Sequence, residues 1–248
     1  MDQHQPSPLQ PMLRKLQQWK ALDPSDRRAV LALPYRLKSI EPLAYIVREG
    51  DQPSHSCLVV HGFAFRQKVV ADGGRSISAI HMRGDIVDLQ NSLLRTADHN
   101  VQTLTRCDVA YIPHGAIQTL AFAFPNIGMA MWYDTLVDAS IFREWIANVA
   151  RRDAPSRLAH LLCEFALRLE AAGIGEKLDY ELPMSQEQLA DCTGLTSIHV
   201  NRTLKALEAR GDITRSRRRV GIGDWDKLRN TADFRSSYLH MPELAVAA

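Results

Sequence analysis

The stretch LADCTGLTSIHVNRTLKALEARG, residues 189–211, limits the possible fold of this chain more than any other segment. It contains two short amphipathic segments separated at Gly194. Ser185 and Gln188 have the form of a capping box, in which the serine side chain satisfies an orphan amide and the glutamine reaches back. We therefore expect a helix that begins at Gln186 and ends at the glycine.

A second helix is expected directly after this turn, capped by Thr196. Its apolar positions predict a buried side formed by Val200, Leu204 and Leu207. The rest of its surface carries Ser197, Ile198, His199, Asn201, Arg202 and Lys205. Two short helices joined by a tight turn indicate a helix-turn-helix, whose second helix enters the DNA major groove with its N-terminal residues toward the base edges.

Positive charge is concentrated around this motif. Residues 196–222 hold seven basic and two acidic side chains, a local charge of +5, whereas the whole chain has a net charge of only +2. The run DITRSRRRVGIGD alternates like a hairpin, with Ile213 and Val220 inward. An isolated charge run is usually a solvated face, but a basic hairpin behind a helix pair favours contacts with phosphates. The candidates are Arg215, Arg217, Arg218 and Arg219.

The N-terminal half has a different texture. We expect one helix from Leu9 to Trp19 and a second from Ser25. Between Glu41 and Pro113, short β-type runs alternate with turn signals at the segments EGD, DGG and RGD. This pattern predicts an antiparallel β-roll of the jelly-roll type.

A long helix is expected over residues 127–151, with two apolar stripes. The first stripe, expected to pack on the β-roll, is Met129, Trp132, Leu136 and Ile146. The second stripe, expected to face a second copy of the chain, is Met131, Phe142, Trp145 and Val149. Pairing would hide a surface that one roll cannot cover. Periodicity alone leaves open a helix buried within a single chain.

The chain length suggests two domains rather than one. Pro155 is expected to end the long helix by moving Ala154 out of the α region, with Ser156 capping the next helix. We predict an α+β protein with N-terminal helices and a β-roll sensor domain in residues 1–126. A dimerisation helix follows in residues 127–152, and a winged helix-turn-helix domain in residues 153–248.

No stretch has the features of a signal peptide or a membrane span, which predicts a cytoplasmic protein without a membrane partner. The cysteines are far apart in sequence and form no C-x-x-C pair, so we expect reduced, buried thiols. They are Cys57, Cys107, Cys163 and Cys192.

The segment LPMSQEQLADCTGLTSIHVNRTLKALEARGDI, together with Arg83-Gly84-Asp85 after the roll, resembles the Crp/Fnr family of transcriptional regulators. The resemblance covers nearly the whole chain. It implies a homodimer on double-stranded DNA with a two-fold symmetric site, and RNA polymerase as a further partner. It also implies that Arg202 faces a guanine. Many members have a glutamate at the position of Ile198.

The sensor domain departs from the family pattern for cyclic nucleotides. Those members carry Gly-Glu-Leu, where this chain has Val87-Asp88-Leu89, and an Arg-Ser or Arg-Thr pair, where it has Ala97 and Asp98. An aspartate in place of the arginine repels a phosphate, so cyclic AMP is not expected. Iron-sulfur members use N-terminal cysteines, and none precedes Cys57. That cofactor is not expected either.

Other sensor chemistries stay open, because the sequence does not identify an effector. The remaining candidate groups are His55, His61, His81, His99 and His114. They lack the close His-x-His pair and following glutamate of the cupin metal enzymes, so we expect no metal, no cofactor and no catalytic residues. Two alternatives to a DNA-binding regulator remain: a cyclic-nucleotide module that acts on a protein partner, and a cupin-like enzyme. Neither explains the C-terminal hundred residues.

Overall fold

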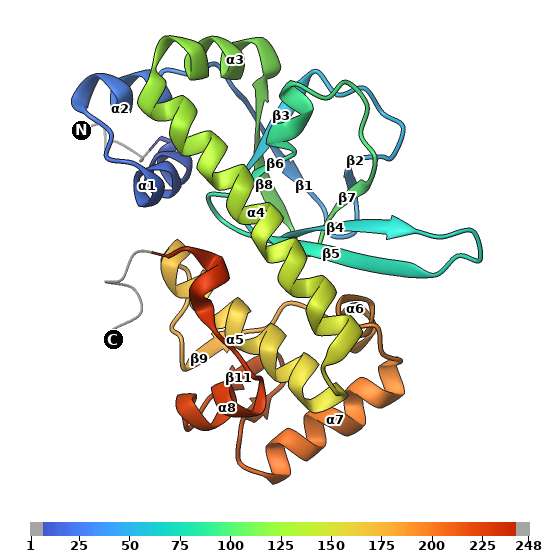
Figure 1. The fold of residues 1–248 in the computed structure, drawn as a ribbon. Coiled ribbons are helices and arrows are strands. Elements are labelled where there is room, and N and C mark those ends of the chain that lie inside the picture. The colour runs from blue at the N-terminus through green and yellow to red at the C-terminus, as the bar shows by residue number, and fades with distance from the viewer. Residues whose placement is uncertain (1–6, 242–248) are drawn as a thin grey trace, which may run out of the picture. The chain divides into compact units, whose positions relative to one another are not determined.

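The computed structural model describes residues 7–241, so residues 1–6 and 242–248 of the predicted domains lie outside the described part of the chain. Two compact units are present (Figure 1). Among the described residues, unit 1 contains 7–67 and 80–138, and unit 2 contains 68–79 and 139–241. The boundary therefore falls within the long helix, and the tip of one β-hairpin belongs to unit 2.

Unit 1 is built on the predicted β-roll, which consists of two four-stranded antiparallel sheets with the strand orders β1-β8-β3-β6 and β2-β7-β4-β5. The strands are β1 (Arg36–Ile40), β2 (Tyr45–Val47), β3 (His55–His61), β4 (Ala64–Val69), β5 (Arg75–His81), β6 (Ile86–Val87), β7 (Asn100–Thr103) and β8 (Cys107–Pro113). Leu58 lies opposite both Ala110 on β8 and Ile86 on β6.

Two apolar cores stabilise unit 1. One lies within the roll and includes Val59, Val101 and Val109, all fully buried. The other joins the roll to helices and the short helix η1. These elements are α1 (Gln10–Trp19), α2 (Pro24–Leu31), η1 (Leu89–Ser92), α3 (His114–Ala123) and the first half of α4 (Pro125–Arg151).

Unit 2 contains the predicted helix-turn-helix and a small antiparallel sheet in the order β10-β11-β9. Its elements after α4 are α5 (Ala154–Ala172), β9 (Asp179–Glu181), α6 (Gln186–Thr193), α7 (Ser197–Ala209), β10 (Thr214–Ser216), β11 (Arg219–Gly221), α8 (Trp225–Thr231) and η2 (Ser236–Leu239). The sheet and the helix pair together form the winged helix-turn-helix of the predicted α+β fold.

The start of α5 corrects the expectation about Pro155. Ala154 is helical, and the N-cap is Asp153, whose side chain accepts a hydrogen bond from the Ser156 amide at 2.9 Å. Proline is tolerated in the first helical turn because the amides there have no partner within the helix. The preference of a residue before proline for extended backbone is overridden at this position.

All four cysteines are buried free thiols, as predicted. Burial raises the pKa of the Cys107 thiol to about 11, and it raises those of the other three further.

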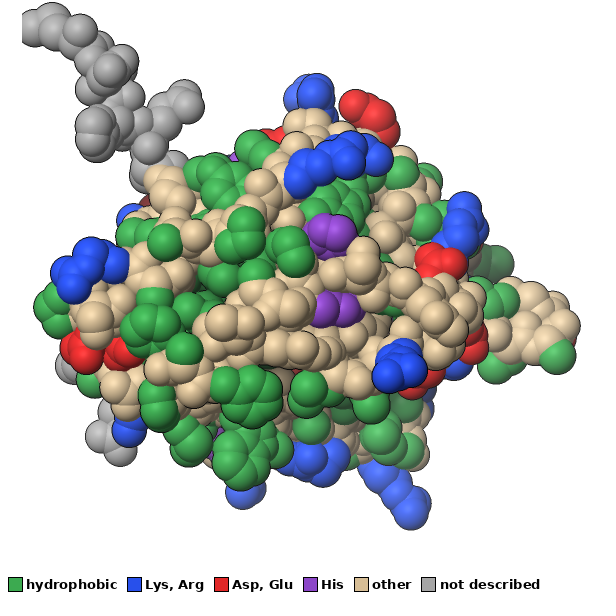
Figure 2. Space-filling view, turned by 90° about the horizontal axis from the view of Figure 1, so that it is seen from above, with side chains coloured by type: hydrophobic (Ala, Val, Ile, Leu, Met, Phe, Trp, Pro, Cys, Tyr) green, Lys and Arg blue, Asp and Glu red, His purple; other side chains and the backbone are tan. Residues whose placement is uncertain are grey.

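Within the described residues, no helix is long and apolar enough to cross a membrane. Figure 2 shows hydrophobic side chains interspersed with charged ones over the face of the molecule that it presents.

Candidate nucleic-acid interface

The turn between α6 and α7 has the predicted local chemistry. The side chain of Ser185 accepts a hydrogen bond from the amide of Gln188, whose side chain accepts one from the Ser185 amide. Gly194 adopts a left-handed φ of 65°, and Thr196 accepts a hydrogen bond from the His199 amide at 3.2 Å. Glycine fits this conformation without the steric cost that a Cβ would bring.

The buried side of α7 is also as predicted, and it fixes which residues remain outside. Val200, Leu204 and Leu207 are at most 2% exposed. The opposite side borders a hollow of about 430 Å³, lined by Gln186, Ser197, Ile198, Asn201, Arg202 and Lys205. Ile198 is 83% exposed, which is unusual for an isoleucine. The arrangement presents one apolar and several hydrogen-bonding groups at one surface.

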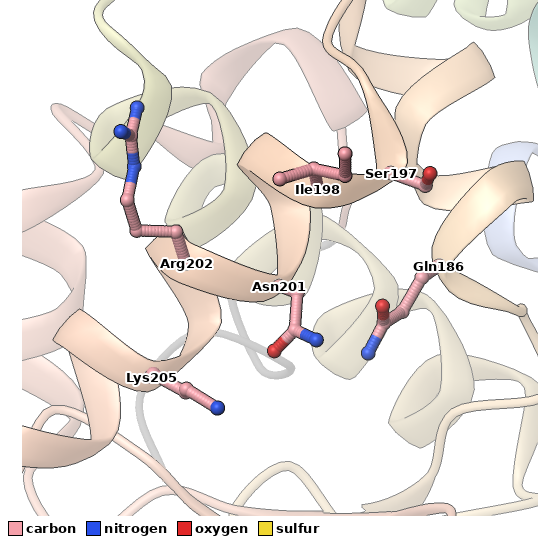
Figure 3. A pocket seen from close by; sticks show the side chains of 6 residues that line it. All are labelled: Gln186, Ser197, Ile198, Asn201, Arg202 and Lys205. Atoms are coloured by element: carbon pink, nitrogen blue, oxygen red, sulfur yellow. The ribbon is translucent and has the colours of Figure 1, made fainter.

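Figure 3 shows how these side chains lie. Gln186 from α6 and Asn201 from α7 face each other, while Arg202 extends away from them. Gln186 was not among the predicted contact residues. A sequence signal for Gln186 does exist, because it is the first residue after the capping serine of α6. In the structure it shares the hollow with Ser197, the first residue of α7.

The wing places its four arginines in different surroundings. Arg215 is half-buried on β10 and pairs with Glu208 at 2.6 Å, and Arg219 forms two hydrogen bonds with Asp179 at 2.7 and 3.1 Å. These hydrogen bonds hold the pKa of Asp179 below its usual range. Arg217 and Arg218 form the exposed turn between β10 and β11.

The remaining basic residues beside the wing stabilise a buried carboxylate. Asp212 is fully buried, and Arg210 and Lys227 lie 3.0 and 3.4 Å from its oxygens. Both cations therefore have partners within the unit. Arg210 therefore contributes to the local charge of residues 196–222 while its guanidinium pairs with a carboxylate of its own unit.

A further contact joins the hairpin tip of unit 2 to α6. Arg75, the first residue of β5, donates from Nε to Asp191 at 2.7 Å and lies 3.5 Å from Glu187. Burial raises the pKa of Asp191 despite this arginine. The contact restrains the first helix of the helix-turn-helix, and the sequence pattern alone gave no sign of it.

The burial of the two stripes of α4 differs from the expectation. Met131 and Trp145, expected at a subunit interface, are 4% and 7% exposed within their own chain. Phe142 is half-buried and Val149 is exposed. The stripe expected to pack on the roll is the exposed one, formed by Met129, Trp132, Leu136 and Ile146.

Specific neighbours explain why Met131 and Trp145 are buried within their own chain. Met131 packs in the core formed with the N-terminal helices and α3. The indole Nε1 of Trp145 donates to Glu164 on α5 at 2.9 Å, and Tyr238 donates to the same carboxylate at 2.8 Å. Burial raises the pKa of Glu164, although Arg168 and these donors oppose the shift. A tryptophan that has a buried hydrogen-bond acceptor is held inside its own chain.

The positions that depart from the cyclic-nucleotide pattern lie close together in unit 1. Asp88 and Ala97 are buried at 1% exposure, and Asp98 has an exposed side chain. His99 lies between the two aspartates, 2.7 Å from Asp88 and 2.6 Å from Asp98. Arg66 lies 3.9 Å from Asp88. The carboxylates here already have cationic neighbours from their own chain.

The other candidate histidines are distributed over the roll. His81 is buried, and burial together with Arg66 lowers its pKa to about 4. His55 and His114 lie at the start of β3 and of α3, and burial lowers the pKa of His114. His61 is exposed at the end of β3. No cluster of three or more His, Cys, Asp or Glu side chains suited to a metal ion occurs within residues 7–241.

Known proteins resemble the chain in both units. Residues 37–123 match the family model of the cyclic nucleotide-binding domain, and residues 156–231 match that of the Crp-like helix-turn-helix domain. The transcriptional activator protein FnrL of Cereibacter sphaeroides is 26% identical over 187 residues, covering 74% of this chain and 75% of FnrL. The nitrogen fixation regulation protein FixK of Azorhizobium caulinodans is 27% identical over 173 residues, covering 69% of each chain.

A solved structure supports the same fold. FixK2 from Bradyrhizobium japonicum superposes with a TM-score of 0.74 at 22% identity, covering 80% of this chain and 98% of that one. The β-roll, the long helix and the winged helix-turn-helix occur in the expected order. With both family models and these relatives in agreement, the chain belongs to the Crp/Fnr family of DNA-binding transcription regulators.

Proposed function

We propose that the protein acts as a homodimer on a two-fold symmetric DNA site in the cytoplasm, with RNA polymerase as a further partner. The observation that carries this proposal is the exposed N-terminal surface of α7, with Ile198, Asn201 and Arg202 beside one hollow. A helix-turn-helix directs such residues at base edges, and its dimers read two half-sites about one helical turn apart.

The side chains at this surface define the bases that we expect it to read. Arg202 is suited to a guanine, because its guanidinium donates to O6 and N7 together. Asn201 and Gln186 carry the amides that suit adenine. Ile198 offers only an apolar contact, which fits the methyl group of thymine. The half-site therefore differs from that of family members with a glutamate at this position.

The wing supplies contacts with the phosphate backbone through Arg217 and Arg218. Arg217 has a φ of 55°, a region that costs most residues free energy and that glycine occupies easily. An arginine at a strained turn position supports a role for its charge. Arg215 and Arg219 contribute less, because carboxylates of their own unit hold them.

The dimer interface is the exposed stripe of α4. Trp132, Leu136 and Ile146 are all more than half exposed, and this much apolar surface on one helix suits a second copy of itself. Leu136→Glu should shift the protein to monomer and remove operator binding. Leu37→Glu on the edge strand β1 changes a leucine of comparable exposure and should leave both properties intact. A monomeric wild type that binds one half-site tightly in sedimentation would exclude this interface.

The effector is neither cyclic AMP nor an iron-sulfur cluster in this proposal. Ala97 and Asp98 stand where the resemblance places the Arg-Ser pair that holds the cyclic phosphate, and Asp88 pairs with His99. The four cysteines are buried, with thiol pKa values raised by burial, which opposes binding as thiolates. Gel shifts with and without cyclic AMP should give the same affinity.

Selection of binding sites from random DNA tests the function as a whole. We expect symmetric sites with one guanine per half-site that depends on Arg202, and with a thymine opposite Ile198. Selection that recovers the half-site of glutamate-bearing family members would contradict the assignment at Ile198. Recovery of no preferred sequence would contradict sequence-specific recognition by α7.

A further inference from the structure

A chain of charged side chains runs through unit 1 at the place where the resemblance puts the cyclic-nucleotide site. His99 Nε2 lies 2.7 Å from Asp88 Oδ1, and His99 Nδ1 lies 2.6 Å from Asp98. Arg66 NH2 lies 3.9 Å from the same Oδ1 of Asp88, and Arg66 NH1 donates to Asp138 on α4 at 3.0 Å. The network therefore connects the roll to the helix with the exposed stripe.

Asp88 occupies an uncommon backbone conformation in this network. It is 1% exposed and has a φ of 59°, in the left-handed region. Its second oxygen, Oδ2, is buried without a hydrogen-bond partner among the described residues. A buried carboxylate is costly unless it is paired, so its charge depends on His99 and Arg66.

The charge of His99 is the variable part of the network. Burial and the charge of Arg66 lower its pKa, whereas the hydrogen bond and charge of Asp88 and the hydrogen bond of Asp98 raise it, and the net result is a pKa above the ordinary value of 6.5. Because the pKa of His99 is raised in the folded state, its ion pair with Asp88 stabilises the fold at pH values below the unfolded-state pKa. This contribution is lost as pH rises through the folded-state value.

Of the two buried histidines in this part of the roll, His99 is the one whose pKa is raised, so it is the one that changes charge near neutral pH. His81 on β5 has a pKa of about 4, through burial and Arg66, so it stays neutral there. Cys57 on β3 and His114 on α3 also interact electrostatically with Asp88. Farther along the network, Asp85 after β5 lies 3.9 Å from His81, Lys15 on α1 pairs with Asp85 and Asp134, and Asp134 and Asp138 belong to α4.

We propose that Asp88 and His99 form a proton-responsive latch that replaces a small-molecule effector in the β-roll and acts on α4 through Arg66. With His99 protonated, the charge of Asp88 is balanced and Arg66 keeps its contact with Asp138. When the imidazolium releases its proton to solvent, Arg66 is the cation that remains beside Asp88, whose Oδ1 still accepts a hydrogen bond from Gln90 Nε2 at 3.3 Å. The guanidinium then shifts toward Asp88 and loosens Asp138. The consequence for dimerisation rests on the proposed function, because α4 carries the dimer interface in that proposal.

The test follows the full-length dimer across pH with three readouts: NMR of ¹³C-labelled histidine, sedimentation, and binding of a selected DNA site. His99 should titrate above 6.5. From neutral to mildly alkaline pH, the dimer and its DNA complex should weaken by about fivefold, the lower end of typical coupling between sites. His99→Gln should remove this pH dependence, while His61→Gln, a change at an exposed histidine of β3, should keep it.

Asp88→Asn provides a second variant that keeps the size of the side chain and removes its charge. The His99 titration should then move to lower pH, with circular dichroism reporting an intact fold. A His99 titration at or below 6.5 in the wild type overturns the latch, as does a pH dependence of dimerisation that His99→Gln retains. Absence of sequence-specific DNA binding at every pH would refute the proposed function instead, while the histidine NMR and sedimentation still decide on the latch.

Discussion

Arginines occupy opposite environments in the two units. Arg66 in unit 1 has a side chain that is 6% exposed and lies near two aspartates. Arg217 and Arg218 in unit 2 are exposed at the turn of a hairpin. A buried charge must find its partner within the chain, whereas an exposed one is available to a partner outside. The comparison separates internal contacts of unit 1 from the surface of unit 2 that we propose contacts DNA.

The same contrast between paired and exposed arginines occurs within unit 2, in the wing and beside the helix pair. Arg210 and Arg215 look equivalent to Arg218 in the sequence, but Asp212 and Glu208 hold them. Local charge therefore overstates the DNA-binding surface. The basic side chains that can contact DNA are those that pair with no carboxylate of their own chain. Tertiary packing determines which these are, and composition does not.

The largest expected effect comes from removing the buried arginine. Arg66→Met keeps the apolar stem but leaves Asp88 and Asp138 without this cation, and breaking a buried ion pair on one side costs about 3 to 5 kcal/mol. Urea unfolding followed by circular dichroism should show this loss. Arg218→Met, the same change at an exposed site, should alter the free energy of unfolding by less than about 0.5 kcal/mol. Equal effects of the two changes would contradict the comparison.

Base reading should give the next largest effect. Arg202→Ala removes a bidentate contact worth about 1 to 3 kcal/mol of discrimination at one guanine. Competition binding with DNA changed at that guanine should show a preference of roughly 5- to 150-fold in the wild type and almost none in the variant. Arg210→Ala, which affects an arginine paired with Asp212, should leave the preference unchanged. A preference retained in Arg202→Ala would refute its role.

Sequence reasoning succeeded where the determining chemistry is local. The caps at Ser185 and Thr196, the left-handed Gly194, and the buried side of α7 depend on residues within a few positions of one another. Hydrogen-bonding side chains and periodicity therefore predicted them correctly. The same holds for the inward positions Ile213 and Val220, which are both 1% exposed.

Sequence reasoning failed where a residue distant in the sequence determines which side chains are buried or paired. Both stripes of α4 are apolar, so their periodicity predicts two faces without saying which one is covered. Met131 packs in the core with the N-terminal helices, and the buried indole of Trp145 donates a hydrogen bond to Glu164 on α5. The ion pair of Arg215 with Glu208 and that of Arg75 with Asp191 likewise join residues of separate elements. These contacts required the tertiary structure.

Acid should weaken the protein through another buried histidine, His160 on α5. Burial and then Arg152 lower its pKa to about 3, below the unfolded value of about 6.5. Between these values the unfolded chain binds the extra proton, so stability rises with pH at up to about 1.4 kcal/mol per pH unit. His160→Phe keeps the ring packing on Tyr238 and should reduce this slope. Urea unfolding across the window measures the slope, and His61→Phe at an exposed site should retain it. An identical slope in all three proteins would show that His160 is not the group responsible.

The smallest effect, and the sharpest distinction, lies within the wing. Replacing Arg217 and Arg218 together by alanine should weaken binding to all DNA sequences alike. It should also reduce the slope of log affinity against log salt by about two, since each lost phosphate contact removes roughly 0.9. Arg215→Ala is the matched control: its guanidinium lies 2.6 Å from Glu208, so its loss should leave the slope nearly unchanged. Titrations of one operator and one unrelated duplex at several salt concentrations measure both quantities. If Arg215→Ala lowers the slope as much as either exposed arginine does, ion pairing with Glu208 does not withdraw it from DNA, and the distinction between held and available arginines fails within unit 2.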